Sequence, residues 1–472
     1  MKVREALLLD KTGKAIAAQL ERIANSMLES SPDDSGGSEG GSGSISDGFT
    51  NLFTVNGNSH AEKFWNALNA GGKYAGGGKE VHINYDACTP GSTGIQYVKW
   101  WIAYRDTYPE LADGVNTVIK DCIICPEGDK PVLIQFLYKS GSITFENCTF
   151  RNISFWFGRD YQQVITFRNC LIEDNQYHFL TTGEWNQHAE YHIEGCHFRH
   201  MRPNFEEYRA DVKALKLNGW AHGNIRSMGF NIKWFFRDSI FEDCMGALNI
   251  MIQRSSHAPA GDDPKLVEFY MERCIIRKTN GAGLSFSGQP VTGVIRDCMF
   301  YNIGANRCNE EGYDLPTDKQ IMWGSGTEED PYVYACGVGS NAIFSFNWTP
   351  RHELTISNNW MYNMMENGVE GNYRELSYNH IENTGYRMDE GMWNPSTEGI
   401  YGSFAICKGN VIRNPYYNEP GIVITGWTDG SLCYYEDNVI LYDKTDRASE
   451  SVGFELMIPD RPLRLEAGHP QQ

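Results

Sequence analysis

Apolar and polar residues alternate in short segments that recur along most of the chain. The segment ITFENCTFRN at 143–152 is followed by ITFRNCLIED at 165–174, with a cysteine at the same place in both. Nine further segments align on this position, which we call the marker. The markers are Cys122, Cys148, Cys170, Cys196, Ser239, Cys274, Cys298, Asn359, Asn379, Asn410 and Asn438. Some follow each other after little more than 20 residues, and a repeat of this length is typical of a solenoid.

Two positions around the marker predict how the repeat folds. The residues three before and two after it can all face inward, such as Phe145 and Phe150 in one copy. Alternation with polar residues predicts strands. The residue just before the marker is Asn, Asp or Gly in nine of the eleven copies, and these residues tolerate a left-handed backbone. The sequence therefore predicts two short strands joined by a sharp bend, stacked on copies of the same unit.

This pattern resembles the right-handed parallel β-helix of the pectate-lyase-like superfamily, over about 115–458. The resemblance implies an all-β solenoid of about eleven or more coils. It does not fix an activity, because function is carried by sites rather than folds.

The cysteines of the repeat have a structural explanation. Six of them occupy the marker, where Ser or Asn replaces them in other copies, so we expect packed thiols rather than disulfides. Cys122 and Cys125 form a single CxxC without a second pair and without a histidine at ligand spacing nearby. The sequence therefore predicts no metal site and no cofactor.

The N-terminal region differs in composition from the repeat. Residues 1–30 place leucines and isoleucines at helical spacing, and 31–48 form a Gly/Ser-rich linker. A helix on a tether ahead of a rigid rod resembles the N-terminal anchor of bacteriophage tailspike and appendage proteins. The helix is therefore expected to anchor the protein to a particle, or alternatively to cap the rod. Residues 49–114 are expected to cap the first coil, and 459–472 form a C-terminal tail.

Charge and hydropathy restrict partners and location. The net charge of −19 argues against nucleic-acid binding. The apolar run ALLL at 6–9 is too short for a signal peptide or a membrane span. The resemblance to phage appendages implies a virion protein made in the host cytoplasm. It also implies a homotrimer that contacts other virion proteins through residues 1–30 and binds host-surface polysaccharide.

A second strand series follows the markers and supplies the candidate binding site. Polar and aromatic residues alternate with its apolar ones, and a linear glycan needs such partners for its hydroxyl groups and its apolar faces. A solvated sheet face is the alternative interpretation. The expected glycan-binding residues are Trp156, Arg159, Trp185, Lys216, Asn218, Trp220, Asn249, Gln253, Ser285 and Ser287.

Cleavage of a glycan would require placed carboxylates. Asp160 and Glu184 are the candidate catalytic residues. Further acidic candidates are Glu206, Glu207, Asp211, Glu366, Glu370, Asp389 and Glu390. None of them lies in a polygalacturonase or pectate-lyase motif. The favoured hypothesis is therefore a virion appendage that binds host polysaccharide. The alternatives are a depolymerase, either a lyase or a glycoside hydrolase, and a structural spacer.

Overall fold

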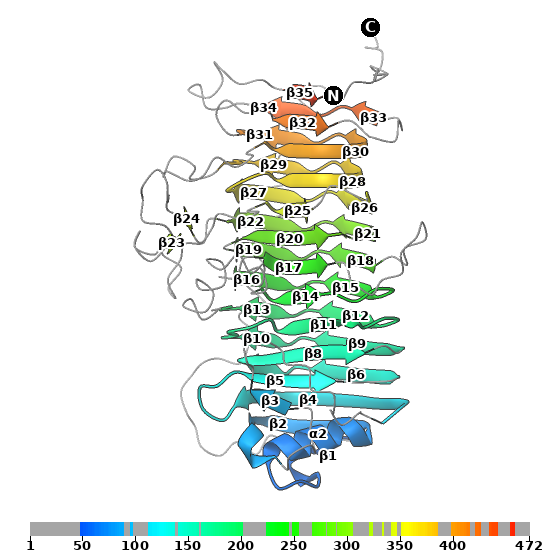
Figure 1. The fold of residues 1–472 in the computed structure, drawn as a ribbon, viewed down its shortest axis with the longest axis vertical. Coiled ribbons are helices and arrows are strands. Elements are labelled where there is room, and N and C mark those ends of the chain that lie inside the picture. The colour runs from blue at the N-terminus through cyan, green and yellow to red at the C-terminus, as the bar shows by residue number, and fades with distance from the viewer. Residues whose placement is uncertain are drawn as a thin grey trace.

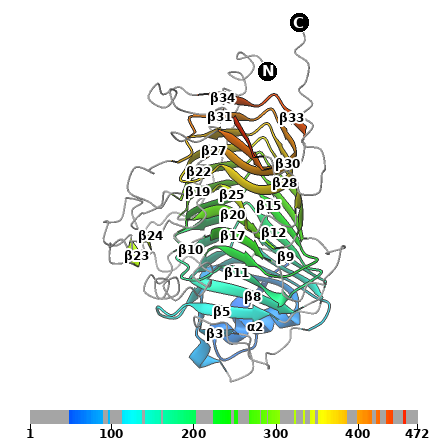
Figure 2. The same cartoon turned by 45° about the horizontal axis from the view of Figure 1, so that its top comes forward.

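The computed structural model describes residues 48–88, 95–97, 112–136, 140–159, 162–201, 223–244, 248–253, 267–279, 281–288, 290–304, 321–323, 333–334, 341–346, 351–385, 398–415, 421–425, 434–441 and 454–457. Within these ranges the chain winds into a stack of coils, each contributing strands to three long parallel ladders (Figures 1 and 2). The predicted fold is confirmed: the chain is a right-handed parallel β-helix.

Sheet 1 contains the strands that precede the bends. They are β4 (Val115–Pro126), β6 (Gly141–Glu146), β9 (Gln163–Arg168), β12 (Glu190–Glu194), β15 (Lys233–Arg237), β18 (Val267–Glu272), β21 (Val291–Arg296), β26 (His352–Ser357), β28 (Val369–Ser377), β30 (Ile400–Lys408) and β33 (Tyr434–Glu436).

Sheet 2 contains the strands that follow the bends, together with the second half of β4. They are β7 (Thr149–Arg151), β10 (Leu171–Glu173), β13 (His197–Arg199), β16 (Ile240–Cys244), β19 (Ile275–Thr279), β22 (Met299–Ile303), β27 (Trp360–Met364), β29 (His380–Glu382), β31 (Val411–Arg413) and β34 (Val439–Leu441).

Sheet 3 contains the second strand series of the sequence, together with the first halves of β28 and β30. Its other strands are β5 (Val132–Phe136), β8 (Ile153–Arg159), β11 (Leu180–Trp185), β14 (Ile225–Ser227), β17 (Leu248–Gln253), β20 (Ala282–Ser287), β25 (Ile343–Phe346), β32 (Ile422–Thr425) and β35 (Phe454–Met457). Away from the ladders, β23 (Ile321–Trp323) and β24 (Val333–Tyr334) form an antiparallel pair.

The predicted register of the repeat is confirmed by the strand pairing. Phe145 pairs with Phe167 in sheet 1, and Phe150 pairs with Ile172 in sheet 2. Both rows continue through all eleven copies, to Tyr435 and Ile440 respectively. The rows are apolar because their side chains stack inside the rod, where the phenyl rings of Phe145 and Phe167 lie 5.2 Å apart.

The sharp bends before the markers are also confirmed. Asn147 and Asn169 both have φ of +51°, in the left-handed region. Arg273 and Tyr378, which break the Asn/Asp/Gly pattern, adopt φ of +51° and +57°. The geometry of the repeat thus overrides the cost of a left-handed backbone at these two residues.

The marker side chains connect neighbouring coils. The Cys196 thiol donates to the carbonyl oxygen of Phe167 on the preceding coil (3.3 Å), and the Ser239 hydroxyl donates to that of Ile193 (3.3 Å). Asn379 Nδ2 likewise donates to the carbonyl oxygen of Ile356 on the preceding coil (2.9 Å). This shared bond explains why Cys, Ser and Asn exchange at the marker. The marker cysteines are free thiols, as predicted.

The stack of coils begins before residue 115. β2 (Gly72–Ile83) pairs in parallel with β4, and β1 (Thr50–Asn51) pairs with β2. Helix α2 (His60–Ala70) covers the end of the interior and buries Phe64 and Trp65 against it. The short helices η1 (Leu52–Thr54) and η2 (Tyr85–Ala87) and strand β3 (Ile95–Tyr97) complete this end. The expected helix within 1–30, most of the linker at 31–48 and the tail at 459–472 lie outside the described residues.

In the described part of the chain, no helix is both long enough and apolar enough to cross a membrane.

Candidate functional site

A row of side chains runs along the outer face of sheet 3, one from each coil. We call it the outer row. Successive strand pairings define it as Gln135, Trp156, Thr181, Arg226, Met251, Ser285, Phe344, Glu370, Tyr401 and Val423. Its residues alternate with apolar ones such as Ile134 and Phe155 that pack in the interior. Because the coils are spaced by about 4.8 Å, the row offers one side chain per rung along the rod axis.

Three predicted glycan-binding residues are not exposed. Trp156 and Ser285 lie on the outer row but are only 3% and 1% exposed. Asn249 is 0% exposed and stands in the register of Ala342, which packs in the core. The prediction of an open polar face is therefore wrong for these three residues. Glycine at 158 leaves room for the Trp156 indole, because a Cβ there would lie 2.1 Å from the ring.

Other predicted residues gather at the ends of β11, β17 and β20. Glu184, Gln253 and Ser287 are half-buried, and Trp185 is 48% exposed. Trp185 pairs with Arg159 on the preceding coil, across an irregularity in the pairing of β11 with β8. Because β14 lies between β11 and β17, these strand ends present a carboxylate, an amide, a hydroxyl and an aromatic ring within four successive coils.

Arg226 joins this group, although the sequence did not single it out. Its Nε donates to Gln253 Oε1 (2.8 Å) on the following coil. Burial lowers the pKa of the Arg226 guanidinium, and the charge of Glu184 partly opposes that effect. Arg226 remains cationic at neutral pH and brings a positive charge to the outer face of an acidic protein.

Further along the outer row, Glu370 is a carboxyl group with a shifted pKa. Asn341 Nδ2 and Asn367 Nδ2 both donate to its Oε2, at 3.0 and 3.1 Å. Burial raises the pKa of Glu370 to about 7, while the two amide donors act in the opposite direction. A carboxyl group that titrates near neutral pH can donate or accept a proton under physiological conditions.

A second buried carboxyl group lies on the coil that follows Glu370. The backbone N–H of Gly368 donates to the carbonyl oxygen of Gly399 on the next coil. Glu398, which directly precedes Gly399, therefore lies one coil after Asn367. Glu398 is 6% exposed. On the outer row itself, Glu370 lies between Phe344 and Tyr401, both half-buried. The outer row around Glu370 thus combines a carboxyl group, two amide donors and aromatic rings.

Two buried polar groups of the outer row have no hydrogen-bond partner within the described ranges. They are both ends of the Gln135 amide and the hydroxyl of Ser285. Buried polar groups of this kind are normally satisfied by water or a ligand.

Some predicted site residues remain untested. Asp160, Lys216, Asn218 and Trp220 lie outside the described residues, so the proposed pairing of Asp160 with Glu184 stays a prediction. Of Arg159, only the backbone position is described.

The sequence did identify Glu370 as a candidate but gave no reason to prefer it. Its amide partner Asn341 was missed because it lies 29 residues away along the chain, whereas Asn367 lies only three residues from Glu370. Arg226 was missed because β14 is only three residues long and shows little alternation. Only the stacking of coils brings these residues to one face.

No protein-family model and no curated protein matches this chain. Solved structures with a similar fold include the A-module of the Azotobacter vinelandii mannuronan C-5 epimerase AlgE4. Its TM-score is 0.42 at 12% identity, over 89% of this chain and 100% of that chain. Another is the catalytic unit of a GH87 alpha-1,3-glucanase from Streptomyces thermodiastaticus, with a TM-score of 0.34 at 10% identity, over 88% and 70%. The alginate lyase AlyF-OU02 has a TM-score of 0.29 at 14% identity, over 89% and 91%. At such identities and TM-scores, these likenesses decide nothing about activity.

Proposed function

We propose that this protein binds and cleaves a linear polysaccharide along the outer row of sheet 3, with Glu370 as the proton-transferring residue. The observation that carries the proposal is a half-buried carboxyl group with a pKa of about 7 on this row. A regular row on parallel coils suits a polymer, because each rung repeats the same spacing.

The binding chemistry follows from the group around Arg226. A guanidinium recognises carboxylates, the Gln253 amide recognises hydroxyl groups, and the exposed Trp185 ring can stack on a sugar face. In a chain of net charge −19, a cation at this position favours a glycan that carries acidic sugars.

The cleavage chemistry follows from Glu370. In its protonated form it can donate its proton to the glycosidic oxygen as the bond breaks. The negative charge left on its carboxylate is then stabilised by the N–H groups of Asn341 and Asn367. Glu398 is the second carboxylate to test, since hydrolysis also requires a base for water.

The experiment incubates the full chain with a panel of acidic and neutral polysaccharides and measures binding together with new reducing or unsaturated ends. We expect products from an acidic glycan. Glu370→Gln should lower kcat at least 100-fold with little change in binding, and Arg226→Ala should mainly weaken binding. The matched control is Glu353→Gln, which changes an exposed carboxylate of sheet 1. Unchanged product formation by Glu370→Gln would contradict the assigned role.

A second candidate function is binding without cleavage, as in a virion appendage that adsorbs to host polysaccharide. The exposed Trp185 beside the Arg159 position favours it, since these residues could hold a glycan without any acid. Attachment to virion proteins through residues 1–30 and a homotrimeric state belong to this proposal. Tight binding of a glycan with no product under any condition would support this candidate over the enzyme.

A further inference from the structure

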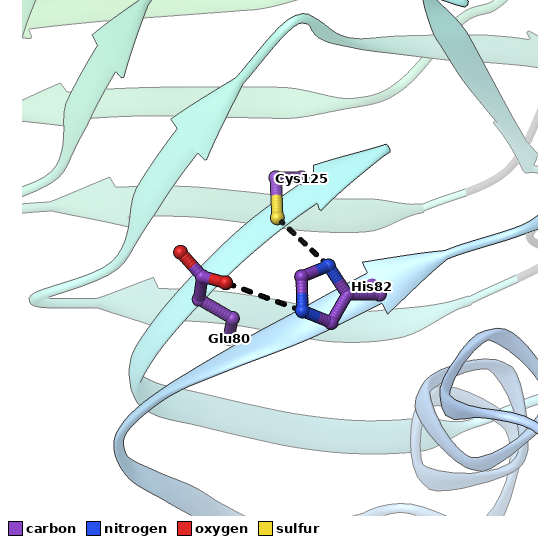
Figure 3. A group of neighbouring side chains, drawn as sticks. All are labelled: Glu80, His82 and Cys125. Atoms are coloured by element: carbon purple, nitrogen blue, oxygen red, sulfur yellow. Dashed lines mark hydrogen bonds and ion pairs between the residues drawn. The ribbon is translucent and has the colours of Figure 1, made fainter. Parts of the chain in front are cut away.

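A cluster of three different metal-binding side chains lies on the outside of the first coil, away from sheet 3. β2 carries Glu80 and His82, and β4 carries Cys125 directly opposite His82 in the strand pairing. Figure 3 shows the three side chains converging on one face of the two strands. Val81 and Ile83 point into the interior, so the alternation of β2 directs Glu80 and His82 outward.

The histidine lies between the other two groups. Cys125 Sγ is 3.6 Å from His82 Nδ1, and Glu80 Oε2 is 3.2 Å from His82 Nε2 (Figure 3). One ligand atom from each residue lies within 4.8 Å of those of the other two. With bonds of about 2.3 Å to sulfur and about 2.0 Å to nitrogen, a tetrahedral zinc site separates its sulfur and nitrogen ligands by about 3.5 Å. The Cys125 thiol and His82 Nδ1 are therefore already at ligand spacing. The Glu80 carboxylate contacts the other ring nitrogen, so it has to rotate to reach a cation held between Sγ and Nδ1.

The position of Cys125 explains why the single CxxC of the sequence is not itself a site. Cys122 packs in the interior as a marker residue, whereas Cys125 lies three residues later on the outer face beside His82. The two cysteines point to opposite sides of the strand. The histidine that completes the site is 43 residues away in the chain and adjacent in space.

The neighbouring groups hold the histidine in place. The His82 backbone N–H donates to His60 Nδ1 (3.3 Å), and the two imidazole rings stack with centroids 6.0 Å apart. Arg151 Nη1 lies 3.7 Å from Glu80 Oε1, but the closer partner of this guanidinium is Glu173, whose Oε1 lies 2.6 Å from Arg151 Nε. The side chains of His82 and Glu80 are 44% and 46% exposed, so a cation can reach them from solvent.

We propose that Glu80, His82 and Cys125 bind a divalent transition-metal cation, with Zn²⁺ as the preferred ion. A mixed set of sulfur, nitrogen and oxygen donors suits borderline cations rather than Ca²⁺ or Mg²⁺. Binding displaces the thiol proton to solvent and leaves the thiolate as ligand. Water completes the coordination. The cation links the first two coils at the end of the rod that α2 covers.

A Cys–His–Glu arrangement could also suggest a nucleophilic triad. We assign the arrangement to metal binding because one ligand atom from each of the three residues lies within 4.8 Å of those of the other two.

The test titrates Co²⁺ into the full chain after treatment with a chelator and follows the sulfur-to-cobalt charge-transfer absorption. We expect one Co²⁺ per chain and loss of the absorption when Zn²⁺ is added. Cys125→Ser and His82→Gln should abolish the absorption, and Glu80→Gln should weaken binding about 10-fold. The matched control is Cys88→Ser, which removes another thiol near the same end and should leave the absorption intact.

Two results would overturn the proposal: no charge-transfer absorption in the unmodified chain, or the same absorption in Cys125→Ser. His82→Gln provides the independent variant, because His82 is exposed and its replacement should not disturb folding. Thermal unfolding curves of all variants confirm that they are folded before the titration is compared.

Discussion

At the scale of single residues, the chemistry of the outer row is concentrated in the Glu370 carboxyl group. Burial favours its neutral form, while the amides of Asn341 and Asn367 stabilise its charged form. The result is a pKa of about 7, compared with an ordinary value of 4.5. The same balance that suits proton transfer also makes the folded state sensitive to pH.

Glu370 should lower the stability of the protein as pH rises. Its folded pKa lies above its unfolded pKa, so the folded state binds more protons between about pH 4.5 and 7. The stabilisation is fully present below about pH 4.5 and is lost as pH rises through about 7. Since Glu370 is partly exposed, we expect a loss on the order of 1–2 kcal/mol. Urea unfolding at pH 5 and pH 8 should show this loss in the unmodified chain and not in Glu370→Gln. Equal losses in both proteins would contradict the assignment.

Asn379 shows how one marker residue stabilises three coils. Its Oδ1 accepts from the backbone N–H and from the side-chain Nδ2 of Asn359, both at 3.0 Å. Its Nδ2 donates to the carbonyl oxygen of Ile356 on the preceding coil and to Asn410 Oδ1 on the following coil. Because these partners are buried, Asn379→Ala should cost about 2–4 kcal/mol of unfolding free energy. Denaturant titration measures the loss, and Lys233→Ala at an exposed ion pair is the control. A loss below about 1 kcal/mol would show that the partners find water instead.

At the scale of elements, the bend before each marker fixes how a strand of sheet 1 leads into sheet 2. The bend requires one residue with positive φ. Where the side chain of that residue is exposed, the bend depends on the backbone conformation and not on the identity of the side chain. Asn169 is such a residue, with φ of +51°.

Replacement of Asn169 should therefore depend on the backbone rather than on lost contacts. Asn169→Val should destabilise the protein by about 1–2 kcal/mol, because a β-branched residue is strained in this region. Asn169→Gly should stay within about 0.5 kcal/mol of the unmodified chain. Thermal and urea unfolding of the pair provide the measurement. If both variants lose the same stability, a side-chain contact of Asn169 is responsible and the bend argument fails.

Helix α2 serves as the cover of the first coil. The Trp65 ring is 2% exposed and lies 5.9 Å from the Phe136 ring. Trp65→Ala would leave a cavity at the open end of the interior, and we expect a loss of about 3–5 kcal/mol. Asn66→Ala, on the exposed side of the same helix, is the control. The midpoint of urea unfolding checks both, and a small effect of Trp65→Ala would mean that the coils are stable without this cover.

At the scale of the whole molecule, the repeat made the fold predictable and the site only partly so. The rows through Phe145 and Phe150 follow from alternation and spacing within each copy, which are local properties of the sequence. The contacts of Glu370 with Asn341 and of His82 with Cys125 join residues 29 and 43 positions apart. Such contacts depend on the lengths of intervening segments, and these do not follow the repeat.

The burial of the outer row was the main error of the sequence interpretation. Alternation correctly places Trp156 and Ser285 on the outer face, but it carries no information about what covers that face. The Trp156 ring lies close to Gly158 on the same coil and to Gly183 on the following coil, where a side chain would collide with it. A pattern of glycines beside a tryptophan could have indicated this in advance.

The central claim is that Glu370 transfers a proton while the protein cleaves a polysaccharide on sheet 3. The most direct measurement is the rate of product release from an acidic polysaccharide between pH 5 and pH 9, for the unmodified chain, Glu370→Gln and Glu353→Gln. With Glu370 as acid, the rate should fall as pH rises through about 7, in the unmodified chain and in Glu353→Gln. Glu370→Gln should be at least 100-fold slower and should lack this transition. A Glu370→Gln protein that keeps both the rate and the transition near pH 7 would contradict the claim.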